Sequence, residues 1–191
     1  MKILKTLSSA LILSALPVLA MAHPGHEFPQ LGFLSGFVHP FTGLDHMSMA
    51  AGLGVLLWKT KRQWQMSGVV VLVAALLIGF MVGAQNLLSA SVAEYGIVAS
   101  LMLLAVALWR KHSVLMPVAT AALAIFHGMA HGVELSSHGH WAGLMLGMVT
   151  AMALLYGIGL GVGALLERYI PEQGRKIVAG MVALVGLLGL A

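Results

Sequence analysis

Long apolar runs separated by short polar connections dominate this sequence of 191 residues. About 20 apolar residues are needed to cross the hydrocarbon core of a bilayer, and six runs approach or exceed that length. They are Leu31 to Trp58, Met66 to Leu88, Val92 to Trp109, Val114 to Glu134, Trp141 to Leu165 and Ile177 to Ala191, the last being the shortest. The connections leave no room for a second soluble domain. The pattern therefore predicts an all-α membrane protein, a single bundle of six transmembrane helices.

The N-terminal segment has a different pattern. Lys2 and Lys5 precede an apolar stretch that ends in the small-residue site Ala20-Met21-Ala22. This order is typical of a secretory signal peptide. We predict a cleaved signal peptide over residues 1–22 and a transmembrane domain over residues 23–191. The alternative interpretation is a retained first helix.

The cationic residues give the spans an orientation. Beyond the predicted signal peptide, all Lys and Arg residues fall in the connections after spans one, three and five: Lys59, Lys61, Arg62, Arg110, Lys111, Arg168, Arg175 and Lys176. The connections Ala84 to Ser91 and Leu135 to His140 carry no Lys or Arg. By the positive-inside rule the basic end is cytoplasmic. We expect a multi-pass protein of the bacterial inner membrane with a periplasmic N-terminus.

Composition narrows the chemistry. The chain is 60% hydrophobic and 8% charged, which is too little polar surface for a soluble domain of this size. Its formal net charge of +4 comes from short clusters without an extended basic face, so nucleic acid is excluded as a partner. The absence of cysteine excludes disulfides and thiolate metal sites. Any metal ion must be bound by His, carboxylate, Met or backbone oxygen.

Span one contains three ionisable residues, His39, Asp45 and His46. Each such group inside a membrane costs about 2.5–3.5 kcal/mol on insertion scales, and such groups are functional by default. The two histidines are seven residues apart, so on a regular helix they share a face but lie about 10 Å apart along the axis. Pro40 and Gly43 lie between them and favour a kinked or unwound segment that brings the rings closer.

Span four carries the second cluster, His127, His131 and Glu134. Their spacing of i, i+4 and i+7 places two imidazoles and a carboxylate on one stripe of a helix. Two histidines at i and i+4 are a common way for a helix to offer two nitrogens to one ion. Because imidazole suits Ni, Co, Zn and Cu, the two clusters predict a divalent transition-metal site.

Other side chains could take part in the same chemistry. After cleavage, His23 and its free α-amine would lie outside, where they could capture an ion, although solvated loop histidines are the plain alternative. Met47, Met49 and Met129 lie close to the histidines in sequence, but methionine is a common apolar filler and we interpret them so. Glycines recur every four residues in Gly79 with Gly83, Gly139 with Gly143 and Gly147, Gly157 with Gly161 and Gly159 with Gly163, a pattern that lets helix backbones approach closely in lipid.

The two clusters have the forms H-x5-D-H, from His39 to His46, and F-H-G-x-A-H-G-x-E, from Phe126 to Glu134. In a chain of six spans behind a signal peptide, these motifs resemble those of the HupE/UreJ family of nickel and cobalt permeases. The resemblance implies uptake of Ni²⁺, or of Co²⁺ in some members, with hand-over to cytoplasmic chaperones or apoenzymes and no prosthetic group. Its metal-binding residues would be His39, Asp45, His46, His127, His131 and Glu134, with His23 after processing.

The sequence leaves several mechanisms open. No G-x-x-x-x-G-K-[ST] motif for ATP is present, so we expect facilitated diffusion or secondary transport rather than an ATP-driven pump. We also expect a transporter and not an enzyme. An intramembrane zinc hydrolase is one alternative, although Gly128 stands where a zincin-like helix would place its general base. A metallocentre assembly protein without transport is another. We expect spans one and four to be adjacent, and three spans per half also permit inverted repeats.

Overall fold

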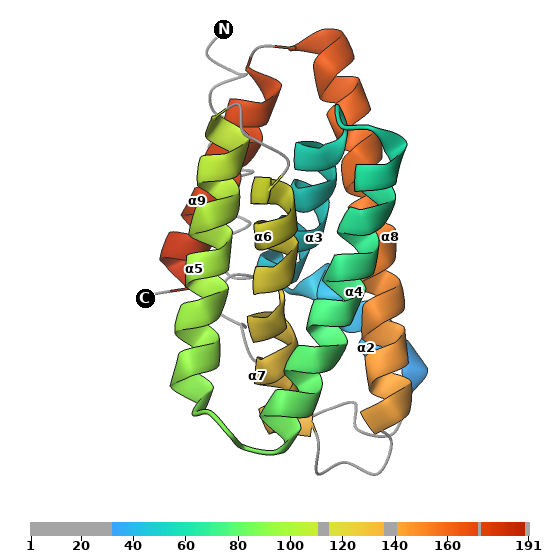
Figure 1. Ribbon diagram of the computed structural model, residues 1–191, viewed down its shortest axis with the longest axis vertical. Coiled ribbons are helices and arrows are strands. Elements are labelled where there is room, and N and C mark those ends of the chain that lie inside the picture. The colour runs from blue at the N-terminus through green and yellow to red at the C-terminus, as the bar shows by residue number, and fades with distance from the viewer. Residues whose placement is uncertain (1–31, 111–114, 136–140, 172, 190–191) are drawn as a thin grey trace, which may run out of the picture.

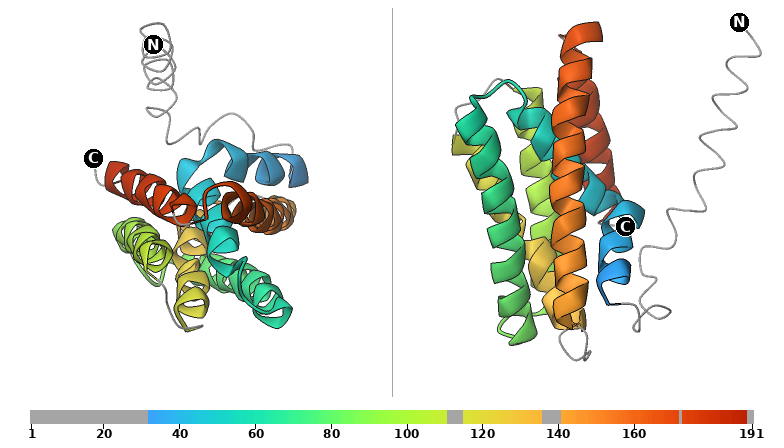
Figure 2. Two further views of the ribbon diagram at one scale, coloured as in Figure 1. Left: turned by 90° about the horizontal axis from the view of Figure 1, so that it is seen from above. Right: turned by 90° about the vertical axis from the view of Figure 1, so that its right-hand side faces the viewer.

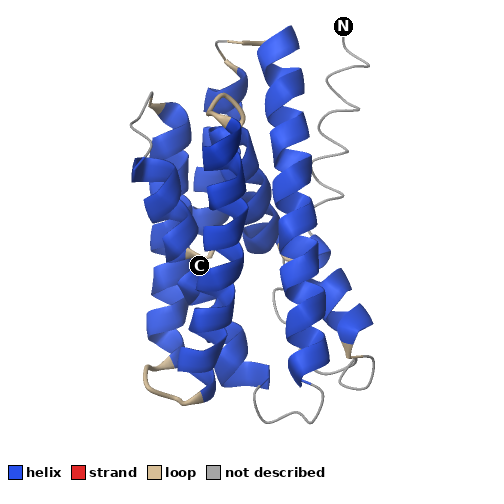
Figure 3. Cartoon of the chain, turned by 45° about the vertical axis from the view of Figure 1, so that its right-hand side comes forward, coloured by secondary structure: helices blue, strands red, loops and turns tan. Residues whose placement is uncertain are grey.

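The computed structural model describes residues 32–110, 115–135, 141–171 and 173–189, so the predicted signal peptide and His23 lie outside the described residues. The helices are α2 (Phe33–Thr42), α3 (Leu44–Leu57), α4 (Arg62–Ala84), α5 (Ala90–Trp109), α6 (Leu115–Leu123), α7 (Ile125–Leu135), α8 (Trp141–Tyr169) and α9 (Gly174–Leu188). Within these ranges the chain forms only helices and short connections (Figure 3). The predicted all-α class is confirmed for this part of the chain.

Two predicted spans are each built from two helices. The run Leu31 to Trp58 contains α2 and α3, which are separated at Gly43. The run Val114 to Glu134 contains α6 and α7, which are separated at Ala124. The first break agrees with the kink expected near Gly43, whereas the second is a correction, because no Pro or Gly marks it in the sequence.

Among the described residues, three helices are each long and apolar enough to cross a membrane, namely α4, α5 and α8. Helix α3 is a shorter apolar helix, and α9 has 15 residues. Large apolar side chains project outward from these helices; Val70, Leu146 and Met181 are each more than 60% exposed. Such an outer surface is suited to lipid.

The two spans that are each built from two helices, α2 with α3 and α6 with α7, are called the broken spans. Glycine contacts join each broken span to a long helix. A Cβ atom added to Gly79 of α4 would overlap the carbonyl oxygen of Ile125 in α7, and one added to Gly128 of α7 would overlap that of Leu76 in α4. The pairing of α2 and α3 with α8 is of the same kind, through Gly36, Gly147, Gly54 and Gly159. Of the predicted glycine stripes, Gly157 and Gly161 alone have no atom within 4 Å of an added Cβ in the described structure.

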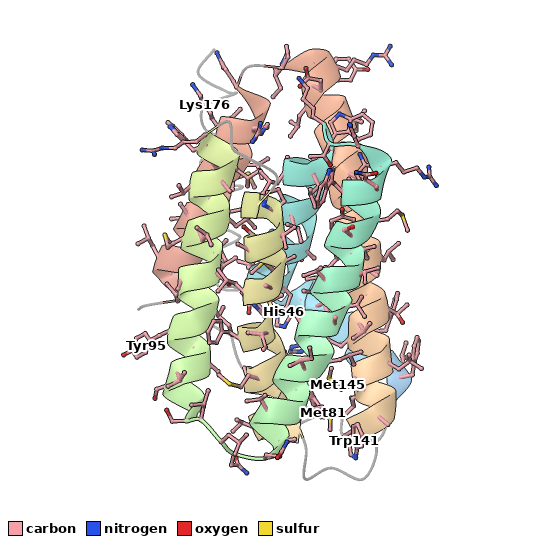
Figure 4. All side chains as sticks on the ribbon, viewed as in Figure 1. His46, Met81, Tyr95, Trp141, Met145 and Lys176 are labelled. Carbon is pink, nitrogen blue, oxygen red and sulfur yellow. The ribbon has the colours of Figure 1, made fainter. Side chains whose placement is uncertain are left out.

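The connection between α3 and α4, the end of α5 and the connection between α8 and α9 all lie at one end of the bundle (Figure 1). The Lys and Arg residues of the described chain lie in these segments or in the adjoining turns of α4, α8 and α9, so the charge asymmetry predicted from the sequence is also an asymmetry of the fold. Lys176 marks this end in Figure 4. Polar contacts join the segments at this basic end. Lys59 pairs with Glu167, and the Arg175 guanidinium donates to the carbonyl oxygens of Ala107 and Arg110, both at 3.3 Å.

Helix α3 lies near the middle of the bundle, surrounded by the other helices (Figure 2). From Met49 to Leu57 its side chains are almost all buried, against apolar residues of α4, α5, α8 and α9. His46 lies near mid-height of the bundle (Figure 4). The half of the bundle on the basic side of His46 is therefore packed with apolar side chains.

Candidate metal site

Three histidines from three different helices meet inside the bundle. His39 of α2, His46 of α3 and His131 of α7 each offer a ring nitrogen, and these nitrogens all lie within 4.8 Å of one another. His46 and His131 are 5% and 6% exposed, and His39 is half-buried. Spans one and four are therefore brought together, as the sequence predicted.

The break at Gly43 brings His39 and His46 together. On a regular helix residues seven apart are separated by about 10 Å along the axis, but the two ring centroids lie 5.0 Å apart and the rings are nearly perpendicular. Helix α2 ends at Thr42, where the Thr42 hydroxyl donates to the carbonyl oxygen of His39 at 2.8 Å. The Gly43 N–H donates to the same oxygen at 3.2 Å, and α3 then begins at Leu44 in a new direction (Figure 2).

His131 completes the group from the opposite side. Its Nε2 atom lies 2.8 Å from Nε2 of His46, and its ring centroid lies 4.7 Å from that of His39. Two nitrogens that bind one ion at about 2.0–2.1 Å each are separated by about 3 Å. The His46–His131 separation therefore suits two ligands of one ion.

Asp45 lies between two of the histidines. Its Oδ1 atom accepts a hydrogen bond from Nδ1 of His46 at 3.0 Å, and its Oδ2 atom is 3.7 Å from Nε2 of His127. Because an ionised carboxylate is only an acceptor, this bond assigns the proton of His46 to Nδ1 and leaves the Nε2 lone pair for the side facing His131. Asp45 is also in the first turn of α3, where the helix dipole stabilises a negative charge.

His127 is fully buried, one turn deeper on α7 than His131. Its ring centroid is 5.2 Å from that of His46. Neither of its ring nitrogens, nor Nε2 of His39, has a hydrogen-bond partner among the described residues. Buried polar atoms usually have partners, so these three nitrogens are suited to bind a further polar group or an ion.

Glu134 lies at the exposed edge of this group. It is in the last turn of α7, its side chain is 45% exposed, and its Oε2 atom is 3.9 Å from Nδ1 of His131. Five of the six residues predicted in the two spans thus lie together, and Glu134 lies beside His131 at the more exposed edge. His23 lies outside the described residues.

The sequence prediction missed one feature of span four. Gly128 and Gly132 each follow a histidine and form their own stripe, which packs on the backbone of α4 at Leu76 and Phe80. The signal was present as a four-residue glycine spacing inside the histidine motif. Close packing of one side of α7 on α4 leaves its histidines to face α2 and α3.

A family model described as HupE / UreJ protein matches residues 11–189. The chain belongs to the HupE/UreJ family. It is also similar to the Protein HupE of Rhizobium leguminosarum bv. viciae, with 28% identity over 187 residues that cover 94% of each chain. No solved structure matches it. The family resemblance inferred from the two histidine motifs is therefore confirmed, and this HupE/UreJ protein carries both motifs at the place where its two broken spans meet.

Proposed function

We propose that this HupE/UreJ protein carries Ni²⁺, or Co²⁺, across the bacterial inner membrane into the cytoplasm. The observation that supports it best is the group of three imidazoles from three helices, with ring nitrogens within 4.8 Å of one another inside an apolar bundle. Imidazole is a good ligand for nickel and cobalt, whereas Mg²⁺ and Ca²⁺ favour oxygen ligands. The ion is the transported substrate, and no prosthetic group is required.

The proposed route begins at the end of α7 opposite the basic end of the bundle. If the basic end is cytoplasmic, Glu134 is on the periplasmic side, His131 is next, and His127 is deeper along the same helix. His23, at the processed N-terminus, would be on the same side as Glu134. In this arrangement each broken span, α2 with α3 and α6 with α7, crosses the membrane once. The other four passages are made by α4, α5, α8 and α9. Cytoplasmic chaperones or apoenzymes then accept the ion.

The membrane potential is sufficient to drive entry. A potential of 100 mV, negative inside, contributes about 2.3 kcal/mol per elementary charge and therefore about 4.6 kcal/mol for a divalent cation. This favours facilitated diffusion or secondary transport without an ATPase domain. Binding of the ion by cytoplasmic proteins would increase the inward gradient.

The geometry favours transport over hydrolysis. A zinc hydrolase needs a carboxylate that is free to act as a general base on water. The Asp45 carboxylate, which lies inside the histidine group, instead accepts a hydrogen bond from His46.

Uptake of radiolabelled nickel into proteoliposomes, at fixed free metal and fixed potential, tests this function. The wild-type protein should transport, and His131→Ala should abolish uptake at matched protein content, because the group loses a ligand but the helix keeps its propensity. His112→Ala, in the predicted cytoplasmic connection, is the control and should transport normally. Absence of uptake by the wild-type protein, with nickel and cobalt both tried, would favour an assembly role instead.

A further inference from the structure

Gly43 is the single residue between α2 and α3, and its backbone does not require glycine. Its φ of −91° and ψ of 116° lie in the extended region, which any L-residue adopts without strain. The constraint at position 43 is instead the lack of space for a Cβ atom. A Cβ atom at this position would lie 2.7 Å from Nδ1 of His46 and 2.9 Å from Oδ1 of Asp45.

Those two atoms are the donor and the acceptor of the hydrogen bond between His46 and Asp45, at 3.0 Å. A carboxylate that accepts from one nitrogen of a metal-binding imidazole fixes its tautomer and its orientation, and loss of such a partner typically lowers metal affinity by about 10–100-fold. In this protein the bond leaves Nε2 of His46 directed at Nε2 of His131, 2.8 Å away.

We propose that Gly43 is a positioning residue for metal binding: the space left by its missing side chain lets Asp45 hold the His46 ring in the orientation that binds the ion. This inference rests on the proposed function, because it concerns the same site. A methyl group at position 43 would force the carboxylate and the imidazole apart, turn the His46 ring and weaken binding.

The atoms that surround Gly43 separate this role from helix packing. A Cβ atom at Gly36, Gly79 or Gly128 would meet backbone carbonyl groups of a neighbouring helix, so those glycines are needed for the helices to pack. The three atoms nearest to a Cβ atom at Gly43 would instead be side-chain atoms of Asp45 and His46, which can rotate away. Gly43→Ala should therefore leave the fold intact and disturb the site.

Calorimetric titration of the purified protein with Ni²⁺ tests the proposal in four variants alongside the wild type. Gly43→Ala should bind about 10–100-fold more weakly, with a thermal unfolding temperature close to that of the wild type. Gly157→Ala, where an added Cβ meets nothing within 4 Å, is the matched control and should bind normally. Asp45→Asn and the double variant Gly43→Ala/Asp45→Asn should bind equally weakly, because both substitutions act on one hydrogen bond. Additive losses, or normal binding by Gly43→Ala, would overturn the proposal.

A second readout does not depend on the metal. The ¹⁵N chemical shifts of the His46 ring report which nitrogen carries the proton, and Gly43→Ala should change them as Asp45→Asn does. If the wild type bound neither Ni²⁺ nor Co²⁺, the proposed function would fail, while unchanged His46 shifts in Gly43→Ala would still refute the positioning role. If Gly43→Ala did not fold, Gly43→Ala/Asp45→Ala, which removes one obstructing carboxylate, should restore folding; its failure to do so would show that Gly43 serves the backbone.

Discussion

Spans one and four both break near the middle of the bundle, but the two breaks differ in kind. At Gly43 one residue has extended-region backbone angles, so α2 ends and α3 begins as a separate helix. At Ala124 the chain keeps short-range bonds: the Ala124 N–H donates to Ala121 and the His127 N–H donates to Ala124, both at 3.1 Å. The second break is a tightened turn of helix, whereas the first is a true interruption.

The difference shows how each span contributes its histidines. In span one the interruption itself brings His39 and His46 to a ring separation of 5.0 Å. In span four His127 and His131 are aligned by the regular spacing of α7, and the break only separates them from α6. One half of the site therefore depends on a local irregularity of the backbone, and the other half depends on a regular helix.

The two halves of the fold otherwise follow the same order. Each has a broken span, then a long helix, then a further helix, and the broken spans start from opposite ends of the bundle (Figure 1). Each broken span packs through glycine on the long helix of the other half, α2 and α3 on α8, and α7 on α4. This order fits inverted repeats with the site at their interface.

The largest effect on binding should come from the histidine that contacts histidines of both broken spans. His46 has ring contacts with His39, His127 and His131, with centroid separations of 5.0–5.2 Å. His46→Ala should lower nickel affinity by more than the roughly 100-fold upper range for loss of an outer partner. Equilibrium dialysis against Ni²⁺ measures this, with His112→Ala as the control. A loss of less than tenfold would remove His46 from the binding group.

The two histidines of α7 should differ in binding. His131 belongs to the group of three imidazoles, whereas His127 lies deeper and faces Asp45. His131→Ala should therefore lower equilibrium affinity by about 100-fold, while His127→Ala should lower it by about tenfold or less and still abolish uptake. The same dialysis, run beside the uptake assay, separates the two. Equal affinities in the two variants would mean that α7 offers both nitrogens to one ion.

Much of this arrangement could be predicted from the sequence. Apolar runs gave the helices, and the i, i+4 spacing of His127 and His131 predicted their shared face without reference to any other span. Pro40 and Gly43 indicated the first break, because each residue has a known local effect on a helix.

Other features depended on contacts between distant segments. The bond between Asp45 and His46, and the 2.8 Å approach of His46 to His131, follow from how α7 packs on α4 and how α3 packs on α8. Glu134 shares a stripe with His131, yet the end of α7 leaves it exposed. Sequence spacing could align these residues on a helix but could not say which would meet.

A smaller effect, on stability rather than binding, should follow from loosening the regular half of the site. Gly128→Ala places a methyl group against the carbonyl oxygen of Leu76, so α7 must move away from α4. Overpacking of this kind costs about 1–3 kcal/mol of unfolding free energy. Denaturant titration in detergent measures it, with Gly161→Ala as the control, since no atom lies within 4 Å of that added Cβ. Equal stability of the two variants would contradict close packing of α7 on α4.

The smallest effect on binding should come from Glu134, at the exposed end of the same helix. Its carboxylate is 3.9 Å from the His131 ring and its side chain is 45% exposed, and exposed ion pairs contribute less than about 1 kcal/mol. Glu134→Gln should therefore lower nickel affinity by less than about fivefold. The negative charge of Glu134 should instead speed the arrival of the cation. Initial uptake by Glu134→Gln should therefore be slower than that of the wild type at 0.01 M salt, where the screening length is about 30 Å. It should approach the wild-type rate at 1 M salt, where the screening length is about 3 Å. Uptake rates measured at both salt concentrations provide the test. A large loss of affinity that persisted in high salt would make Glu134 a direct ligand and would extend the binding group to the end of α7.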